Sequence, residues 1–527
     1  MTDPSSTPPT SSRSSSRTPI LVGVVVIALI AAVTVGVVWA QRSDDRALAS
    51  WPTPTPTAEG TPAELESFYT QSLDWTDCGR AKCTKVEVPI DYDQPDGDTL
   101  ELSVRLYPAA NGRSERSLFV NPGGPGGSAV DFASSMSGSL GKSVTDVYDV
   151  VGVDPRGVGE STPLTCLDDD AFTEFVDTDP DPETPAEISD LREANAAMGE
   201  ACEANSGELA SHVSTHEVAE DMDVVRALLG RDQLDWFGAS YGTQIGATYA
   251  DLFPERVGRM ILDGAVDPAA TPFESAMGQV TGFQRAFDAY AADCIANDDC
   301  PLGGSVKEAR ATVAGLFDQL DRQPLPAGEG REVTEGQAFY GVALPLYSQQ
   351  TWYVLTDALT QALEQNNGST LAALSDAYFE RQPDGSYNGN QGQVIYAVNC
   401  LDAGTDPTLQ EVEAELPRFE SVSPVFGRAL GWGVLGCTDW PLKSDTPQEP
   451  VTAAGAAPIV VVGTTRDPAT PYENSVKLAQ ELESGVLLSR DGDGHTAYNQ
   501  GNTCIDETLD AYLVDGTVPD DGTKCPA

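Results

Sequence analysis

A serine, a histidine and an aspartate that lie far apart in the sequence could together perform nucleophilic catalysis. Ser240 stands in the string GASYG, whose G-x-S-x-G spacing is typical of a sharp turn between a strand and a helix. A serine hydroxyl is a weak nucleophile at neutral pH and needs a neighbouring base. Of the three histidines in the chain, His495 follows the last predicted strand in the glycine-rich string DGDGHTAYN. These residue types suit acyl transfer, in which the serine attacks a carbonyl group and the imidazole takes its proton.

Asp467 is the predicted third member of this group. It ends the apolar string PIVVVGTTRD, one predicted strand before His495. A carboxylate there would hold the imidazole tautomer and stabilise the imidazolium. Asp491 and Asp493 are the alternatives, but they share a tight loop with the histidine and are better suited to capping that turn. The chain order serine, aspartate, histidine also favours Asp467.

The other two histidines do not indicate a metal site. His212 and His216 lie at the start of a predicted helix in which Ser214 and Glu217 form a capping box. The cap leaves His212 outside the helix, so the two imidazoles and Glu220 do not share one helical face. We therefore expect capping or surface histidines, and no bound metal.

The string NPGGPGGS, residues 121–128, could supply the donors that stabilise an oxyanion. We expect Gly123 and Gly124 to present backbone N–H groups, with a further N–H from Tyr241, the residue after the serine. A dinucleotide-binding loop is the alternative interpretation. Only a degenerate G-x-G-x-x-A pattern fits, prolines replace backbone donors, and no acidic residue follows at the required distance. We therefore expect no cofactor.

Apolar strings that alternate with helical stretches must position these loops. The first two, KVEVPIDY and TLELSVRLYP, alternate as in a half-exposed hairpin, whereas later strings such as LDWFGAS, RMILDGA and PIVVVGTTRD are nearly continuous apolar runs. Such runs are typical of a parallel sheet that is covered on both faces. The long, mostly helical stretch between RMILDGA and PIVVVGTTRD exceeds a normal crossover, so it predicts an inserted domain.

The charge of the chain excludes nucleic acid as an expected partner. Acidic residues number 81 against 30 basic ones, and the net charge is -51. Such a chain repels the phosphates of nucleic acids and anionic lipid surfaces. We expect a soluble, self-repelling surface on the main domain.

An uncharged string near the N-terminus predicts a membrane helix. Residues 20–40 read ILVGVVVIALIAAVTVGVVWA, and about 1.5 Å per residue gives about 30 Å, one hydrocarbon thickness. We expect an uncleaved anchor rather than a cleaved signal, although Val38 and Ala40 are small residues of the kind a signal peptidase reads. Residues 1–19 would form a cytoplasmic tail and the proline- and threonine-rich residues 41–64 a linker.

All ten cysteines follow this segment. Their spacing does not fix the connectivity, but it includes no zinc-type pattern, so disulfides formed in an oxidising compartment are the better interpretation. This places the main domain outside the cytoplasm. We expect sequential pairing of Cys78 with Cys83, Cys166 with Cys202, Cys294 with Cys300, Cys400 with Cys437, and Cys504 with Cys525.

Several strings together resemble those of secreted bacterial tripeptidyl aminopeptidases, relatives of the proline iminopeptidases. The strings are NPGGPGGS, DPRGVGES, GASYGT, ILDGAVDP, DPATPY and GHTAYNQGNTCIDETLDAYLVDGTVP, within roughly residues 78–525. The resemblance implies an α/β-hydrolase fold with an eight-stranded, mostly parallel sheet, a helical cap and short-range disulfides. The core would comprise residues 65–265 and 451–527, and the cap residues 266–450. Residues 499–503 are more polar than this family leads us to expect, which concerns the pocket wall.

The resemblance also implies release of short peptides, tripeptides above all, from free N-termini. We expect the enzyme to be a monomer. An exopeptidase needs a group that binds the substrate ammonium, and a carboxylate in the cap suits this role. Asp402, in the string AVNCLD, is the candidate. A carboxylesterase acting on lipid esters would use the same three residues, and an inactive anchored binding module is the remaining alternative. The acidic string VDTDPDPET lacks the glycine and the terminal glutamate of a calcium loop, so we expect a solvated loop.

Overall fold

A computed structural model describes residues 56, 60–110, 112, 114–297, 300–328, 330–444 and 449–527. The predicted membrane segment at residues 20–40 lies outside these residues, as do the predicted tail and most of the linker. Among the described residues, no helix combines the length and the apolar character needed to cross a bilayer.

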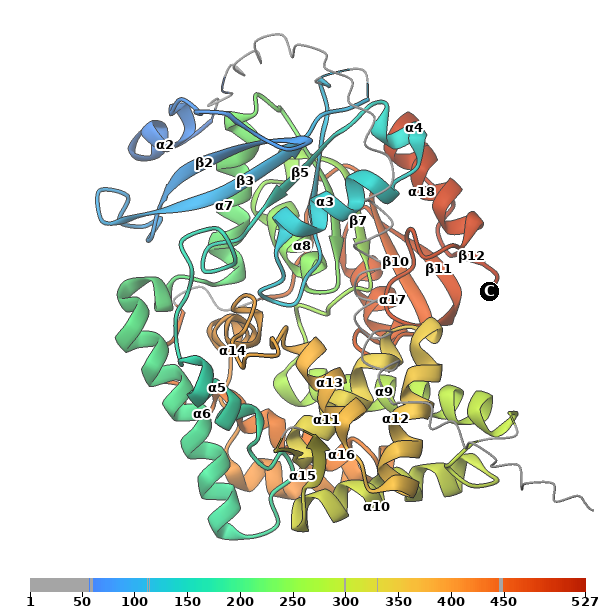
Figure 1. Cartoon of the computed structure of the whole chain (residues 1–527). Coiled ribbons are helices and arrows are strands. Elements are labelled where there is room, and N and C mark those ends of the chain that lie inside the picture. Colours follow the sequence, from blue (N-terminus) through green and yellow to red (C-terminus); the bar gives the residue numbers. More distant parts are fainter. Residues whose placement is uncertain are drawn as a thin grey trace, which may run out of the picture. The chain divides into compact units, whose positions relative to one another are not determined.

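The fold is built around one mixed sheet (Figure 1). Its strands are β1 (Thr76–Cys78), β2 (Ala81–Pro89), β3 (Thr99–Tyr107), β4 (Ser117–Asn121), β5 (Asp149–Val153), β6 (Leu234–Ala239), β7 (Val257–Asp263), β10 (Ile459–Arg466), β11 (Gly485–Asp493) and β12 (Thr523–Cys525). In space they follow the order β1-β2-β3-β5-β4-β6-β7-β10-β11-β12. The pairs from β1 to β5 are antiparallel and those from β5 to β12 are parallel. The predicted opening hairpin and the mostly parallel α/β sheet are therefore confirmed.

The prediction of eight strands is wrong, because the described sheet has ten. The additional strands are the two edges, β1 and β12, each of three residues. A disulfide holds each of them: Cys78–Cys83 joins β1 to β2, and Cys504–Cys525 joins β12 to the last helix. Strands this short carry no apolar pattern of their own, so periodicity does not reveal them.

Helices cover both faces of the sheet. They are α2 (Glu66–Thr70), α3 (Ala129–Ser139), α4 (Lys142–Thr145), α7 (Thr215–Leu228), α8 (Tyr241–Leu252), α17 (Tyr472–Glu481) and α18 (Thr503–Asp515). Helices α3, α4 and α18 pack with alternate strand residues such as Val120, Phe237 and Ile261 in one apolar cluster. The opposite face receives α8, where a Cβ on Gly246 would lie 2.7 Å from Leu262 Cδ2. This close approach requires glycine, because any side chain would overlap the strand.

A helical layer lies between β7 and β10 in the sequence, as the mostly helical stretch predicted. It comprises α9 (Pro272–Ile295), α10 (Val306–Arg322), α11 (Glu335–Ala343), α12 (Trp352–Gln365), α13 (Ser369–Tyr378), α14 (Gln391–Asp402), α15 (Leu409–Val422) and α16 (Gly427–Trp432), with a small hairpin of β8 (Leu325–Gly328) and β9 (Arg331–Val333). The layer has its own core, in which Phe287, Leu355 and Phe426 are fully buried. Short 3₁₀-helices complete the fold: η1 (Ala63–Leu65), η2 (Gly207–Ser211), η3 (Pro254–Arg256), η4 (Leu344–Tyr347), η5 (Gln349–Thr351) and η6 (Gly433–Cys437).

A second segment joins this layer, although residues 65–265 were predicted to belong to the core. Helices α5 (Asp169–Val176) and α6 (Pro185–Ser206) follow β5 in the sequence but pack on the insertion (Figure 1). The ring of Phe172 in α5 meets those of Phe379 and Tyr387 edge to face, with centroids 5.7 and 4.8 Å apart. Arg192 of α6 forms a two-pronged ion pair with Asp439 at 2.8 and 2.9 Å. The helical layer therefore comes from two separate stretches of the chain.

The five predicted disulfides all form with sequential pairing. No cysteine among the described residues is free. Two of the bridges, Cys166–Cys202 and Cys400–Cys437, tie segments of the helical layer together across 36 and 37 residues. Disulfides persist in oxidising compartments, so they indicate a protein that acts outside the cytoplasm.

Candidate active site

Ser240 occupies the turn between β6 and α8, as predicted. Its backbone has φ 55° and ψ -126°, a strained conformation for a residue with a side chain. The Ser240 N–H donates to the Asp263 carbonyl at 2.9 Å, which fixes the turn on the neighbouring strand. A Cβ on Gly238 would lie 2.1 Å from the Gly242 carbonyl oxygen, so the flanking glycines are sterically required. In turns of this type the serine hydroxyl is exposed above the sheet, and here the turn lies at the N-terminus of α8.

His495 and Asp467 form a buried pair near this turn. Both carboxylate oxygens of Asp467 lie 2.9 Å from His495 Nδ1. Asp467 is 1% exposed and also accepts backbone N–H bonds from Ala469, Thr470 and Thr496 at 2.9–3.1 Å. Burial disfavours the charged imidazole, but the charge and hydrogen bond of Asp467 outweigh it and raise the pKa of His495. The carboxylate is thus oriented by four donors before any substrate binds.

The alternative carboxylates point elsewhere. Arg466 Nε donates to Asp493 Oδ1 at 2.6 Å, and its Nη1 donates to Asp491 Oδ1 at 3.0 Å. Both aspartates are therefore engaged by one guanidinium, whereas Asp467 is bonded to the imidazole. The aspartate beside the imidazole is therefore Asp467, the residue that the chain order serine, aspartate, histidine favoured.

The register of the sheet brings the three loops to one edge. Asn121 pairs with Gly238, Ala239 with Asp263, and Arg466 with Asp493. Because these strands are parallel, their carboxyl ends are level, and Ser240, Asp467 and His495 follow directly.

The serine and the histidine lie on either side of the end of β7. Ser240 is bonded to the Asp263 carbonyl, and a Cβ on the next residue, Gly264, would lie 3.3 Å from His495 Cε1. In the described part of the chain, the Ser240 hydroxyl makes no hydrogen bond to the imidazole. In free hydrolases this contact is often long, and it tightens when substrate binds.

Two residues that the sequence analysis missed hold the histidine loop. Asp263 accepts N–H bonds from Ala497 at 3.0 Å and from Tyr498 at 2.8 Å, and burial raises its pKa to about 6. Tyr347, at the end of η4, accepts the His495 N–H at 2.8 Å and packs its ring edge to face on the imidazole. A signal for Asp263 was present, because it ends an apolar strand at the same edge as Asp467. The sequence around Tyr347 contains no pattern that indicates its contact with the histidine.

The glycine loop lies beside the serine, but its glycines have different roles. The Gly123 N–H donates to Asn121 Oδ1 at 2.8 Å, so the prediction of Gly123 as an oxyanion donor is wrong. A Cβ on Gly123 would instead lie 2.8 Å from the Tyr241 nitrogen and 2.9 Å from Ser240 Cβ. Gly123 therefore keeps the space next to the Tyr241 N–H open. Gly124 and Tyr241 remain the donors that we propose for the oxyanion.

The helical layer rests directly on this loop. A Cβ on Gly126 would lie 2.9 Å from Gln391 Cα, at the first turn of α14. On the core side, Asp154 Oδ1 accepts hydrogen bonds from the Ser128 hydroxyl at 2.8 Å and the Val130 N–H at 3.0 Å. The loop is thus fixed between both layers.

Comparison with known proteins places this arrangement in a family. Residues 423–525 match the family model described as TAP-like protein. The chain is 40% identical over 477 residues to the serine protease Hip1 of Mycobacterium tuberculosis, covering 86% of this chain and 91% of that protein. The chain belongs to this family of α/β-hydrolases. The predicted resemblance and the serine hydrolase class are both confirmed.

Two further members of the family carry different names. The tripeptidyl aminopeptidase of Streptomyces lividans is 32% identical over 462 residues, which cover 84% of each chain. A protein of Mycobacterium tuberculosis named carboxylesterase B is 37% identical over 460 residues, or 86% of this chain and 88% of that one. Membership of the TAP-like family thus shows that the chain is a serine hydrolase, but it does not show which substrate the chain hydrolyses.

The predicted ammonium site at Asp402 is wrong. Asp402 is 8% exposed, and burial raises its pKa to about 6. Its carboxylate accepts the Thr215 N–H at 2.9 Å, the Thr215 hydroxyl at 2.5 Å and the Gln244 side-chain amide at 3.0 Å. These donors belong to α7 and α8, so Asp402 fastens α14 to the core of this TAP-like hydrolase. The donors lie on helices that are distant in the sequence, so the residues around Asp402 do not reveal this structural role.

The remaining polar residues singled out in the sequence have structural partners. His212 Nδ1 lies 2.6 Å from Glu217 Oε1, and His216 Nδ1 lies 3.5 Å from Glu220 Oε2. The capping box of α7 forms as predicted. Asn502 caps α18 by accepting the Ile505 N–H, which accounts for one of the polar residues in 499–503.

Proposed function

We propose that this protein is a serine exopeptidase that removes tripeptides from free N-termini outside the cytoplasm. The observation that carries the proposal is the buried Asp467–His495 pair at the sheet edge where the serine turn ends. Relatives named serine protease and tripeptidyl aminopeptidase, at 40% and 32% identity, support peptides as the substrate class.

The reaction is acyl transfer. His495 takes the Ser240 proton as the hydroxyl oxygen attacks the scissile carbonyl, and Asp467 stabilises the imidazolium that forms. The N–H groups of Gly124 and Tyr241 hold the oxyanion. The imidazolium then protonates the leaving amine, and the same base activates water to release the acyl group from the serine.

The cellular setting is part of the proposal. Five disulfides support action in an oxidising compartment. The apolar residues 20–40 would anchor the enzyme in the membrane as a single helix, with the catalytic domain on the outer side. The peptide substrate would be its partner, and the enzyme would act as a monomer.

A second candidate function is hydrolysis of carboxylic esters. The relative named carboxylesterase B, at 37% identity, favours it, and an ester would use the same serine, histidine and aspartate. The two functions differ only in the leaving group, which is an amine or an alcohol.

The experiment compares three substrate sets on the purified full chain. A mixed peptide library with free N-termini, the same library after N-acetylation, and acyl esters are incubated with enzyme, and the products are identified by mass spectrometry. We expect tripeptides from the free library, little release from the acetylated one and slower turnover of esters. Ser240→Ala should abolish every product while keeping its circular dichroism spectrum, whereas Ser421→Ala, at an exposed serine, should match the wild type.

Each alternative outcome is decisive. Equal cleavage of the acetylated library would remove the exopeptidase assignment, and turnover of esters alone would establish the esterase. Product formation by Ser240→Ala would overturn the nucleophile itself.

A further inference from the structure

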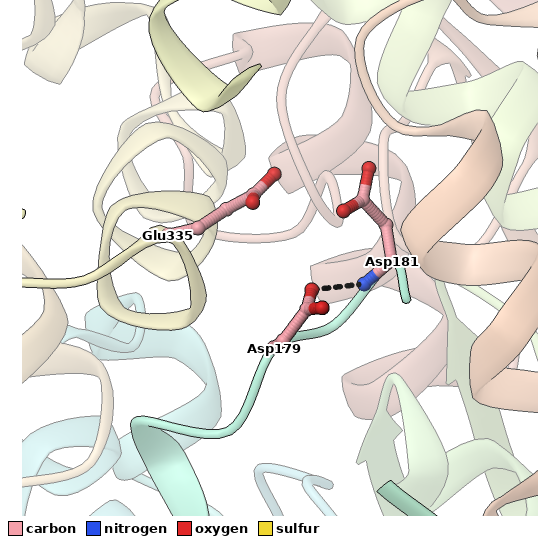
Figure 2. Close-up of side chains that lie close together, drawn as sticks. All are labelled: Asp179, Asp181 and Glu335. Atoms are coloured by element: carbon pink, nitrogen blue, oxygen red, sulfur yellow. Dashed lines mark hydrogen bonds between the residues drawn. The ribbon is translucent and has the colours of Figure 1, made fainter. Parts of the chain in front are cut away.

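Three carboxylates converge where the segment between α5 and α6 packs on the start of α11. Asp179 and Asp181 belong to that segment, and Glu335 is the first residue of α11. Figure 2 shows their side chains directed at a common space, and one oxygen of each lies within 4.8 Å of the others. The Asp181 N–H donates to Asp179 Oδ1 at 2.9 Å, which keeps both aspartates on the same side of the turn.

This arrangement differs from the solvated loop that the sequence predicted. Asp179 and Asp181 are partly buried, and Glu335 is only 5% exposed. Glu335 Oε2 is buried and has no hydrogen-bond partner among the described residues. An ionised oxygen without a donor is costly in such a place, so it requires either a proton or a cation.

Protein cations do not balance the cluster. In the part of the chain that the structure describes, Arg428 is the one cation within ion-pair distance, with its Nε 3.8 Å from Asp181 Oδ2. The same Nε donates to the Asp181 carbonyl at 2.8 Å, and Nη1 donates to Glu420 at 3.2 Å. Burial and the neighbouring carboxylates raise the pKa of Glu335 to about 9 and that of Asp181 to about 7. Asp318 and Asp321 of α10 add further negative potential.

We propose that Asp179, Asp181 and Glu335 bind a calcium ion that fastens the α5–α6 segment to α11. Calcium takes six to eight oxygen ligands, including backbone carbonyls and water, at about 2.3–2.6 Å and in flexible geometry. Magnesium demands a near-ideal octahedron at about 2.0–2.1 Å, which suits three side chains on a turn and a helix end less well. Calcium sites of extracellular modules bind at about 10⁻⁴–10⁻³ M, which fits a domain with five disulfides.

The position of the site gives the ion a structural task. The α5–α6 segment follows β5, whereas α11 belongs to the insertion between β7 and β10. One ion would therefore join the two stretches of chain that make the helical layer. Helix α11 continues into η4, whose last residue, Tyr347, accepts the His495 N–H. The site lies at the other end of the helical run that holds the catalytic base.

The test measures calcium binding and thermal unfolding of the purified full chain after removal of metal with EGTA. We expect one ion per chain by isothermal titration calorimetry, and a rise in the unfolding temperature of about 1–2 °C at tenfold excess over Kd. Magnesium at the same concentration should give a smaller rise. Glu335→Gln should weaken calcium binding at least about tenfold. In EGTA, however, it should unfold close to the wild-type temperature, because the raised pKa of Glu335 leaves that group largely neutral when no ion is bound.

Two further variants complete the test. Asp179→Asn, on the partly buried turn, should also weaken calcium binding. It replaces Glu335→Gln in the test if that variant does not fold. Glu332→Gln, at an exposed position three residues away on β9, should respond to calcium as the wild type does. Absence of both heat and a temperature shift in the wild type would overturn the proposal and assign a proton to the cluster. Wild-type affinity in Glu335→Gln and Asp179→Asn would overturn it equally.

Discussion

Replacing Asp467 with asparagine tests the geometry of the catalytic pair most directly. The carboxylate is held by backbone N–H groups of Ala469, Thr470 and Thr496 and faces His495 Nδ1 with both oxygens. Asparagine has the same size but only one acceptor oxygen, so its amide group must face a backbone donor or the imidazole. The tautomer with a proton on Nδ1 then loses its acceptor, and Nε2 no longer serves as the base.

The size of the effect follows from the two tasks that the carboxylate performs. It fixes the tautomer and stabilises the imidazolium, and loss of both in such a triad costs about 10⁴-fold in kcat. At about 1.36 kcal/mol for each factor of ten, this equals about 5.4 kcal/mol of transition-state stabilisation. Asp491→Asn and Asp493→Asn are matched controls, because their carboxylates bind Arg466 rather than the imidazole. We expect both to keep kcat within about threefold of the wild type.

The assay is the steady-state hydrolysis of a tripeptidyl anilide, with fluorophosphonate labelling of the serine as an independent readout. Asp467→Asn should lower kcat and the labelling rate together while KM and the unfolding temperature change little. If Asp467→Asn kept more than about a tenth of the wild-type kcat, the carboxylate would have neither task. A large loss in Asp493→Asn alone would move the acid to that residue.

Two further substitutions separate positioning from binding. Asp263→Asn removes a negative charge that helps to raise the pKa of His495. The acid limb of the kcat/KM profile marks the pH at which the imidazole loses its proton and becomes the base, so this limb should move to lower pH. An acid limb at the wild-type pH would exclude an effect of Asp263 on the pKa of His495. Asp402→Ala leaves the Thr215 N–H without its acceptor and removes one acceptor of the Gln244 amide. The loss of the buried Thr215 bond should destabilise the protein by at least about 1–3 kcal/mol, without raising KM. A raised KM with unchanged unfolding would restore its ammonium role, and Asp406→Ala, at an exposed carboxylate, is the control.

The parts of the fold that the sequence predicted are those with local signals. Continuous apolar runs revealed the parallel strands, the glycines around Ser240 revealed the turn, and Ser214 with Glu217 revealed the start of α7. Asp467 was predictable because it ends a strand that must finish at the same edge as the serine strand. Each of these inferences needs only the neighbouring residues and the rule that parallel strands share one carboxyl edge.

The errors concern partners that only tertiary packing determines. Asp402 was expected to face substrate, but it meets Thr215, which is 187 residues away. The aspartates of the α5–α6 segment were expected to face water, but that segment packs on the start of α11, where Glu335 lies. In both cases the carboxylates meet an element that lies far away in the sequence, so the neighbouring residues do not reveal the partner. Charge pattern alone therefore underestimates how often acidic residues of this very acidic chain are buried.

The catalytic base is held from both layers of the protein, and this changes what the helical layer does. Asp467 and Asp263 orient the histidine loop from the sheet, while the Tyr347 carbonyl fixes the His495 N–H from the helical layer. On the serine side, α14 rests on the glycine loop, and Asp402 ties that helix to α7 and α8. If the helical layer only selected substrates, its loosening would reduce specificity and leave kcat unchanged. Because this layer positions the base and the oxyanion loop, its loosening should lower kcat for every substrate, esters and peptides alike.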